Sequence, residues 1–183
     1  KKILALILLK KYDFKNAWLS FDGRLSLTDF ANKNSTLKLV QNKIPNKIIS
    51  NKNSKILVIR EQGIGDEILY GTMYCDLLNE FSDLVIECDE RLIPLFKNSF
   101  ESHKDKFVKL GTHSLDTNKI NSFDYIIYAG SLGKYFRNDL NSFSQNPYIK
   151  NLENYKDSEL DNILNKTPGL KIGISWKSLN NRY

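Results

Sequence analysis

Two glycines and two carboxylates stand close together in one segment, where Gly63 and Gly65 come just before Asp66 and Glu67. Glycines at this spacing let the backbone turn tightly and let a ligand approach without a Cβ in the way. Such a turn at a helix start often binds phosphate, but two carboxylates in the first turn would repel a phosphate. The segment therefore predicts a ligand-binding loop that presents a carboxylate.

A dinucleotide-binding loop is one alternative. Gly63 and Gly65 fit the first two glycines of that fingerprint. An acidic residue, Glu87 or Asp89, follows where a ribose partner is expected. Against this, Ile68 stands where the fingerprint requires a small third residue, and the two carboxylates oppose a pyrophosphate.

The elements around the loop alternate between apolar runs and segments with a helical period. The runs predict strands at Lys55–Arg60, Leu84–Cys88, Phe107–Leu110, Phe123–Ala129 and Leu170–Trp176. The helical periods predict helices at Asp66–Phe81, Glu90–Asn98 and Asp157–Asn165, with a short helix and loop over Ser131–Phe143. This alternation is typical of an α/β fold with a mostly parallel sheet and right-handed crossovers.

The carboxyl ends of parallel strands form the edge at which open α/β sheets bind ligands. The glycine loop follows the first strand at this edge, and Gly130 and Ser131 follow the fourth strand there. Helix capping alone would also explain Asp66, because Asp is favoured in the first turn of a helix. Capping does not explain why a Gly-x-Gly turn precedes the carboxylate.

The first part of the chain, residues 3–31, predicts two helices. The second has Phe14, Ala17, Trp18 and Phe21 on one face, followed by Arg24. This pattern resembles the last unit of a tetratricopeptide array, but a plain helical hairpin explains it equally. Residues 32–54 are rich in Asn, Lys and Ser and predict a linker, with a short helical piece around residues 37–41.

The composition is that of a globular protein, with 41% hydrophobic residues and a net charge of +6. Lysines are scattered among asparagines, which indicates a solvated surface without a nucleic-acid partner. The apolar run Ile3–Leu9 is far shorter than the ~20 residues that span a bilayer. The two cysteines, Cys75 and Cys88, lie in apolar patterns and are expected to be free thiols. We therefore expect a cytoplasmic protein without a membrane span.

The segment Arg60–Ile68 resembles the first-loop motif of the heptosyltransferase-like GT-B glycosyltransferases, glycosyltransferase family nine. The resemblance is greatest to bacterial forms that are fused behind tetratricopeptide repeats, in which an Ala-Trp helix like Ala17-Trp18 precedes the motif. Four further segments resemble the family in the same order along the chain: Val85–Leu95, Phe123–Leu132, Pro147–Ile149 and Lys171–Ser178.

This resemblance implies a Rossmann-like acceptor domain over residues 55–168 and the start of a truncated donor domain at residues 169–183. It implies inverting transfer of a sugar from a nucleotide-sugar to a hydroxyl of a glycan, lipid or protein, without a metal or a further cofactor. Asp66 matches the proposed general base of the family. The implied acceptor contacts are Gln62, Gly63, Gly65, Gly130 and Ser131, and Lys177 is a candidate contact for the donor phosphate.

Several alternatives stay open at this point. Asp66 would position the acceptor hydroxyl without taking its proton if the helix N-terminus stabilises the carboxylate strongly. Arg137 is a candidate contact for an acceptor phosphate or carboxylate, or a residue that faces solvent. Without a complete donor domain, the 183-residue chain is expected to be inactive alone. A non-catalytic module that binds a protein or carbohydrate through its helical hairpin, and a dinucleotide-binding enzyme, are the other functions that the sequence permits.

Overall fold

The computed structural model describes residues 2–26, 41–45, 49–111, 117–150 and 158–174. They divide into two units along the chain, Lys1–Asn151 and Leu152–Tyr183, and each is described by itself. Within the described residues, no helix is long and apolar enough to cross a membrane.

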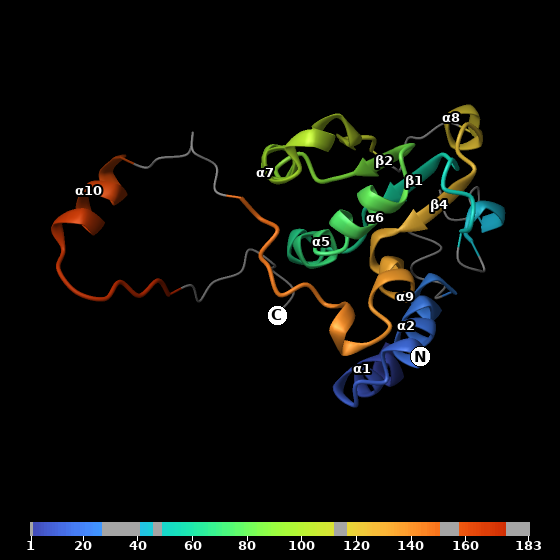
Figure 1. Ribbon diagram of the computed structural model, residues 1–183, viewed down its shortest axis with the longest axis horizontal. Coiled ribbons are helices and arrows are strands. Elements are labelled where there is room, and N and C mark those ends of the chain that lie inside the picture. The colour runs from blue at the N-terminus through green and yellow to red at the C-terminus, as the bar shows by residue number, and fades with distance from the viewer. Residues whose placement is uncertain (1, 27–40, 46–48, 112–116, 151–157, 175–183) are drawn as a thin grey trace. The chain divides into compact units, whose positions relative to one another are not determined.

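A parallel sheet lies at the centre of the first unit, with its four strands in the order β3-β2-β1-β4 (Figure 1). The strands are β1 (Ile56–Ile59), β2 (Leu84–Glu87), β3 (Phe107–Val108) and β4 (Tyr125–Tyr128). Ile56 of β1 pairs with Leu84 on one side and with Tyr125 on the other. All four residues of β1 are buried, as expected for the central strand of a sheet covered on both faces. The predicted α/β class with a parallel sheet is therefore confirmed.

Short helices connect the strands. The chain between β1 and β2 forms α5 (Ile64–Gly71) and α6 (Tyr74–Glu80), and the chain between β2 and β3 forms α7 (Ile93–Ser99) and the 3₁₀ helix η3 (Glu101–Lys106). Helix α8 (Thr117–Asn121) precedes β4, and η5 (Ala129–Leu132), α9 (Gly133–Phe136) and η6 (Leu140–Ser142) follow it. The chain between β1 and β2 and the chain between β2 and β3 are thus mainly helical, as the sequence pattern predicts, whereas α8 lies where no helix was expected.

The helix predicted over Asp66–Phe81 is in fact two helices, interrupted at Thr72 and Met73. Arg137 stabilises the interruption: its guanidinium donates to the Thr72 carbonyl (2.7 Å) and pairs with Asp76 (2.8 Å). The Arg137 residue is only 3% exposed. Both sequence-based roles for Arg137 were therefore wrong, because its guanidinium neither faces solvent nor is open to a ligand.

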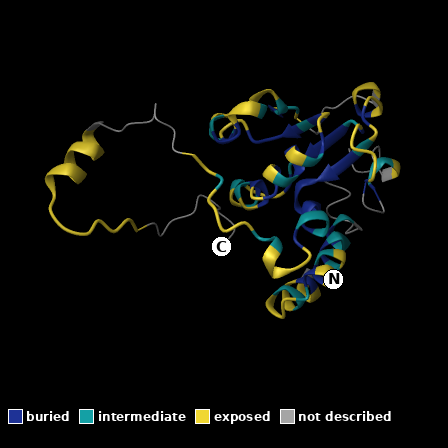
Figure 2. Cartoon of the chain, viewed as in Figure 1, coloured by how far each residue is buried: buried dark blue, intermediate teal, exposed yellow. Residues whose placement is uncertain are grey.

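Two apolar clusters cover the two faces of the sheet. The larger cluster combines Ile56 and Val58 of β1 with side chains of α5, α6 and α7, among them Tyr74 and Phe96. The smaller one lies on the opposite face and includes Leu57 and Ile59 with residues of α8 and β4. Alternate residues of a strand point to opposite faces, so β1 contributes to both clusters. Figure 2 shows the four strands in the colour of buried residues.

Two helices precede the sheet, α1 (Lys2–Lys10) and α2 (Phe14–Phe21), followed by the 3₁₀ helix η1 (Asp22–Ser26). They pack against each other and confirm the predicted helical pair; residues 27–31 lie outside the described part. Helix α2 docks on the α/β fold through Trp18, whose ring lies over Gly133 and whose Nε1 donates to the Arg137 carbonyl (2.6 Å). The helical pair is thus attached directly to α9.

Two segments remain to be compared with the sequence predictions: the expected linker over residues 32–54, and the second unit. The 3₁₀ helix η2 (Gln41–Lys43) lies in the expected linker, where residues 37–40 are outside the described part. Helix α10 (Ser158–Lys166) agrees with the helix predicted over Asp157–Asn165. Residues 170–174 form no strand, and Leu170, Ile172 and Ile174 are exposed. A strand requires a neighbouring strand for its backbone hydrogen bonds, and none accompanies this segment among the described residues.

We predict that Gly133→Ala destabilises the protein. A Cβ at this position would lie 2.5 Å from the Trp18 ring, which is rigid and held by its hydrogen bond to Arg137. The free energy of unfolding, measured by urea denaturation, should fall by about 1–3 kcal/mol. Gly65→Ala is the matched control, because that glycine is also helical and a Cβ there meets nothing within 4 Å. Equal stability of the two variants would contradict the docking described here.

Candidate functional site

The loop between β1 and α5 lies at the point where the strand order reverses. Because β2 and β4 flank β1, the chain leaves the sheet centre in opposite directions, and the carboxyl ends of β1 and β4 lie at the edge where open α/β sheets bind ligands. The structure brings the loops after these two strands into contact. The Glu61 carboxylate, two residues after β1, accepts a hydrogen bond from the backbone N–H of Gly130, two residues after β4 (2.7 Å).

Asp66 lies in the first turn of α5, where its carboxylate faces back toward the loop. Its Oδ2 accepts the backbone N–H of Gly63, the residue that caps the helix (3.1 Å). The capping role is therefore confirmed, and Asp66 nevertheless stays partly exposed. A carboxylate that is oriented by a backbone N–H and open to solvent on one side can meet a ligand hydroxyl without rearrangement.

The three expected acceptor contacts near Asp66 lie in the same loop. Gln62, Gly63 and Gly65 are all exposed. Gln62 has a positive φ of 65°, an uncommon conformation for a residue with a side chain. Its Nε2 donates to the Tyr70 hydroxyl (2.8 Å), which fixes the direction of the amide. No contact limits a Cβ at Gly65, so this glycine leaves open space in front of the helix.

Gly130 and Ser131 lie apart from this exposed surface, in a buried network that the sequence did not reveal. Arg24, which follows α2, donates through Nε to Glu61 (2.8 Å), and its Nη2 contacts both Glu61 and the Ser131 hydroxyl. Ser131 in turn donates to Asp22 (2.6 Å). Arg24 and Glu61 are 37 positions apart, so no local pattern connects them. The only signal was an arginine at the end of an amphipathic helix and an acid at the end of an apolar strand.

A second ion-pair cluster fixes the other side of the loop. Glu67 is fully buried and accepts the backbone N–H of Asp89 (2.9 Å), while its other oxygen pairs with Arg60 (2.7 Å). Burial raises the pKa of Glu67, and the Asp89 N–H and the Arg60 charge act in the opposite direction. The second carboxylate of the motif therefore holds α5 to the ends of β1 and β2.

Asp89 lies at the centre of this cluster and is one of the two acidic residues, with Glu87, that were candidates for a dinucleotide ribose. Arg91 bonds to both of its oxygens (2.8 and 3.0 Å), and Arg60 contacts one of them (3.0 Å). The hydrogen bonds from Arg91 hold the pKa of Asp89 well below its usual range. Because both oxygens are already paired, a ribose would have to displace a guanidinium, so the structure gives the dinucleotide alternative no support.

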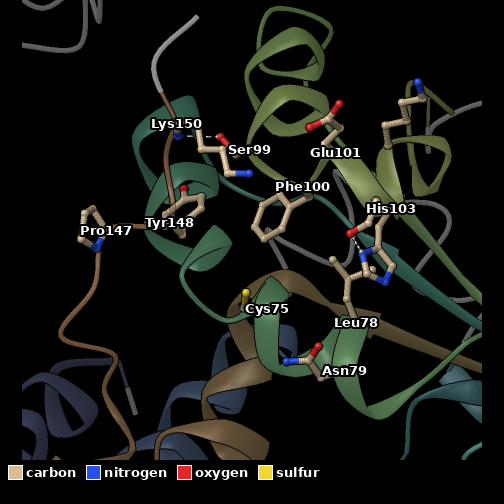
Figure 3. A pocket seen from close by; sticks show the side chains of 12 residues that line it. Cys75, Leu78, Asn79, Ser99, Phe100, Glu101, His103, Pro147, Tyr148 and Lys150 are labelled. Carbon is tan, nitrogen blue, oxygen red and sulfur yellow. Dashed lines mark hydrogen bonds between the residues drawn. The ribbon is translucent and has the colours of Figure 1, made fainter.

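The structure also contains an open pocket of about 820 Å³ between α6, the end of α7 and residues 147–150 (Figure 3). Its aromatic wall consists of Phe100 and Tyr148, whose rings stack 5.7 Å apart. The Tyr148 hydroxyl donates to the Ile68 carbonyl of α5 (2.6 Å), and burial raises its pKa to about 12. None of the lining residues belongs to the Gly63–Asp66 segment, so this pocket is separate from the candidate loop.

Neither the remaining candidates nor the comparisons with known proteins add to the site. Lys177 lies outside the described residues. Among the residues that the structure covers, no group of three His, Cys, Asp or Glu side chains could hold a metal ion, and Cys75 and Cys88 are free. No family model, no curated protein and no solved structure matches the chain. Any functional conclusion therefore depends on the geometry of the loop and on the resemblance of its motif.

We predict that Asp89→Asn weakens the dependence of stability on pH in acid. The folded-state pKa of Asp89 is depressed, so the carboxylate stabilises the fold above its unfolded pKa of about 3.9 and loses this effect as the pH falls further. The free energy of unfolding should therefore fall less steeply below pH 4 in the variant than in the parent protein.

The matched control for this measurement is Asp83→Asn, since Asp83 is exposed at the opposite end of β2. The control should keep the slope of the parent protein. An unchanged acid slope in Asp89→Asn, measured by denaturant titration at each pH, would show that the two arginines do not hold Asp89 as described.

Proposed function

We propose that the chain is the acceptor side of a glycosyltransferase that transfers a sugar, with inversion, from a nucleotide-sugar to a hydroxyl group. One observation carries the proposal: the partly exposed Asp66 carboxylate, oriented by the Gly63 N–H, lies on a glycine loop at the carboxyl edge of the central strand. The motif around it resembles the first loop of the heptosyltransferase-like GT-B enzymes. The parallel sheet supports the fold that this resemblance implies.

In the proposed reaction the acceptor hydroxyl binds against Asp66, with Gln62 and the open backbone of Gly63 and Gly65 beside it. Asp66 accepts the hydroxyl proton as the oxygen forms its bond to the anomeric carbon of the donor sugar. The bond between that carbon and the departing phosphate breaks on the opposite face, so the configuration inverts and the nucleoside diphosphate leaves with the bonding electrons. In the weaker form of the proposal, Asp66 only positions the hydroxyl.

The nucleotide-sugar would be bound by a second Rossmann-like domain that begins near residue 169, with Lys177 as a contact of the donor phosphate. Gly130 and Ser131 would support the acceptor side from below the loop, since both are buried against Glu61 and Arg24. The helical pair would be the last tetratricopeptide unit of the same protein. No metal is part of this proposal.

A second candidate function, a binding module, is favoured by the surface of α1. Four of its apolar side chains are exposed to between 45% and 75%: Ile3, Leu4, Leu6 and Ile7. Neighbouring apolar side chains of this kind on one helix often mark a contact with another protein. This function does not require Asp66, so a binding module should keep its affinity for its partner when Asp66 is replaced by Asn.

We predict that Asp66→Asn in the intact enzyme lowers the rate of sugar transfer by about 10²–10⁴-fold, the usual contribution of a general base. The measurement is release of nucleoside diphosphate from a panel of nucleotide-sugars in the presence of acceptor. Asp83→Asn, at the opposite end of the strands, is the control and should keep the parent rate. Turnover of Asp66→Asn close to that of the parent would exclude both the base and the positioning role.

We also predict that the 183-residue chain alone shows no detectable transfer and weak or no affinity for nucleotide-sugars. The reason is that the proposed donor contacts belong to a second domain and not to the proposed acceptor domain over residues 55–168. Calorimetric titration with the same panel of nucleotide-sugars checks this. Micromolar binding by the chain alone would contradict the assignment of this domain to the acceptor.

A further inference from the structure

We propose that Arg24 is a positioning residue for the Gly63–Asp66 loop, so that the N-terminal helical segment forms part of the support of the site. The proposal rests on the proposed function of that loop. Arg24 does not bond to Asp66; it acts through Glu61, which precedes the loop by two residues.

The contact between Arg24 and Glu61 is a two-point contact between buried groups. The side chains are 6% and 1% exposed, and the Nε and Nη2 atoms of the guanidinium meet the two carboxylate oxygens separately. A two-point contact of this kind fixes the orientation of a carboxylate as well as its distance. Glu61 is therefore held in one direction, and so is the backbone that continues from it into Gln62.

The backbone of Gly130 holds the same carboxylate of Glu61. On its other side Oε1 accepts the Gly130 N–H, and a Cβ placed on Gly130 would lie only 2.7 Å from that oxygen. Without Arg24, the Glu61 carboxylate would be a buried charge without a cation, a costly state that is relieved by moving the group toward water. Gln62 and then the Gly63–Asp66 loop follow Glu61 directly, so this movement displaces the start of the loop first.

The strained conformation of Gln62 makes the loop sensitive to that movement. A φ of 65° persists in a residue with a side chain only where the neighbouring groups hold it. The first support is Glu61, the residue before Gln62, which is itself held in place. The second is the hydrogen bond from the Gln62 side chain to the Tyr70 hydroxyl. Release of Glu61 removes the first of these supports, and the Gly63 N–H then loses its fixed direction toward Asp66.

The two carboxylates that flank the loop, Glu61 and Glu67, are held by different parts of the chain. On the helix side, Glu67 is held by Arg60 and by the Asp89 N–H, all within the α/β fold. On the strand side, Glu61 is held by an arginine that follows α2 and comes from outside that fold. The order of the loop therefore depends on whether the helical segment is docked. A substitution in the helical segment alone can therefore alter the order of the loop, although the substituted residue does not contact the loop.

The test is amide hydrogen exchange in the full 183-residue chain, followed residue by residue by NMR without any substrate. The test variants are Arg24→Met and Arg24→Lys. The matched control is Lys134→Met, because Lys134 bonds to Asp22 in the same network (2.8 Å) and makes no bond to Glu61. In Arg24→Met the Gly63 amide should exchange at least tenfold faster, with amides of β2 and α7 unchanged. Arg24→Lys should restore part of the protection, and Lys134→Met should leave Gly63 as in the parent.

Two results would overturn the proposal. One is an unchanged Gly63 exchange rate in folded Arg24→Met; the other is an equal increase in all amides, which marks a general loss of stability. If Arg24→Met does not fold, Arg24→Lys replaces it, since a lysine keeps the charge but cannot meet both carboxylate oxygens of Glu61. The Gly63 amide should then still exchange faster than in the parent, and the same two results decide. In the intact enzyme, Arg24→Lys should lower kcat and leave the KM for the donor unchanged.

These outcomes are independent of the test of Asp66. Exchange at Gly63 is measured without chemistry, so normal turnover of Asp66→Asn would remove the proposed function and leave the coupling between Arg24 and the loop intact. Unchanged exchange at Gly63 would remove the coupling and leave the proposed function intact.

Discussion

The buried pair of Arg24 and Glu61 is the contact on which the arrangement at the carboxyl edge of the sheet depends. It joins three parts of the chain that are distant in sequence: the segment after α2, the end of β1 and the turn after β4. Removing two charges from water is costly, and the cost is offset only where each charge finds several well-placed partners. Here Glu61 has the Gly130 N–H in addition to Arg24, and Arg24 has the Phe21 carbonyl, Ser131 and Asp22. A partly assembled network would be unfavourable, so the three segments come together as one unit.

The same physics separates the roles of two adjacent carboxylates. Asp66 and Glu67 are consecutive residues of one helix, so their side chains point about 100° apart around its axis. Glu67 points inward, is fully buried and is neutralised by Arg60 and the Asp89 N–H. Asp66 points toward the loop and keeps contact with solvent. One carboxylate therefore fixes the helix, and the other is available for a ligand.

The parts that the sequence predicted well depend on local pattern. The unbroken apolar run at β1 and the aromatic face of α2 predicted a buried strand and a packed helix, because burial periodicity is a property of neighbouring residues. The cap at Asp66 was predictable for the same reason. The break between α5 and α6 was not, because the residue that stabilises it, Arg137, lies about 65 positions further along the chain. The ion pairs of Arg24 and Arg60 are likewise set by the tertiary fold, and a one-dimensional pattern cannot identify the partner of a buried charge.

The buried network also limits what can bind at the carboxyl ends of β1 and β4. In a dinucleotide-binding fold the pyrophosphate lies at the first glycine loop, in the crevice between the two loops at the switch point. Here the Arg24 guanidinium and the Glu61 carboxylate lie against Gly130 in that region, and Asp89 is occupied by two arginines. In the proposed function, the acceptor would therefore bind further out, on the exposed surface of Gln62, Gly63 and Gly65, beside the Asp66 carboxylate. A hydroxyl group suits that position better than a phosphate does, since it can donate a hydrogen bond to Asp66, whereas a phosphate would be repelled. In the proposed function, the Arg24–Glu61 pair that occupies this region would thus also be the contact that holds the loop in place for a hydroxyl acceptor.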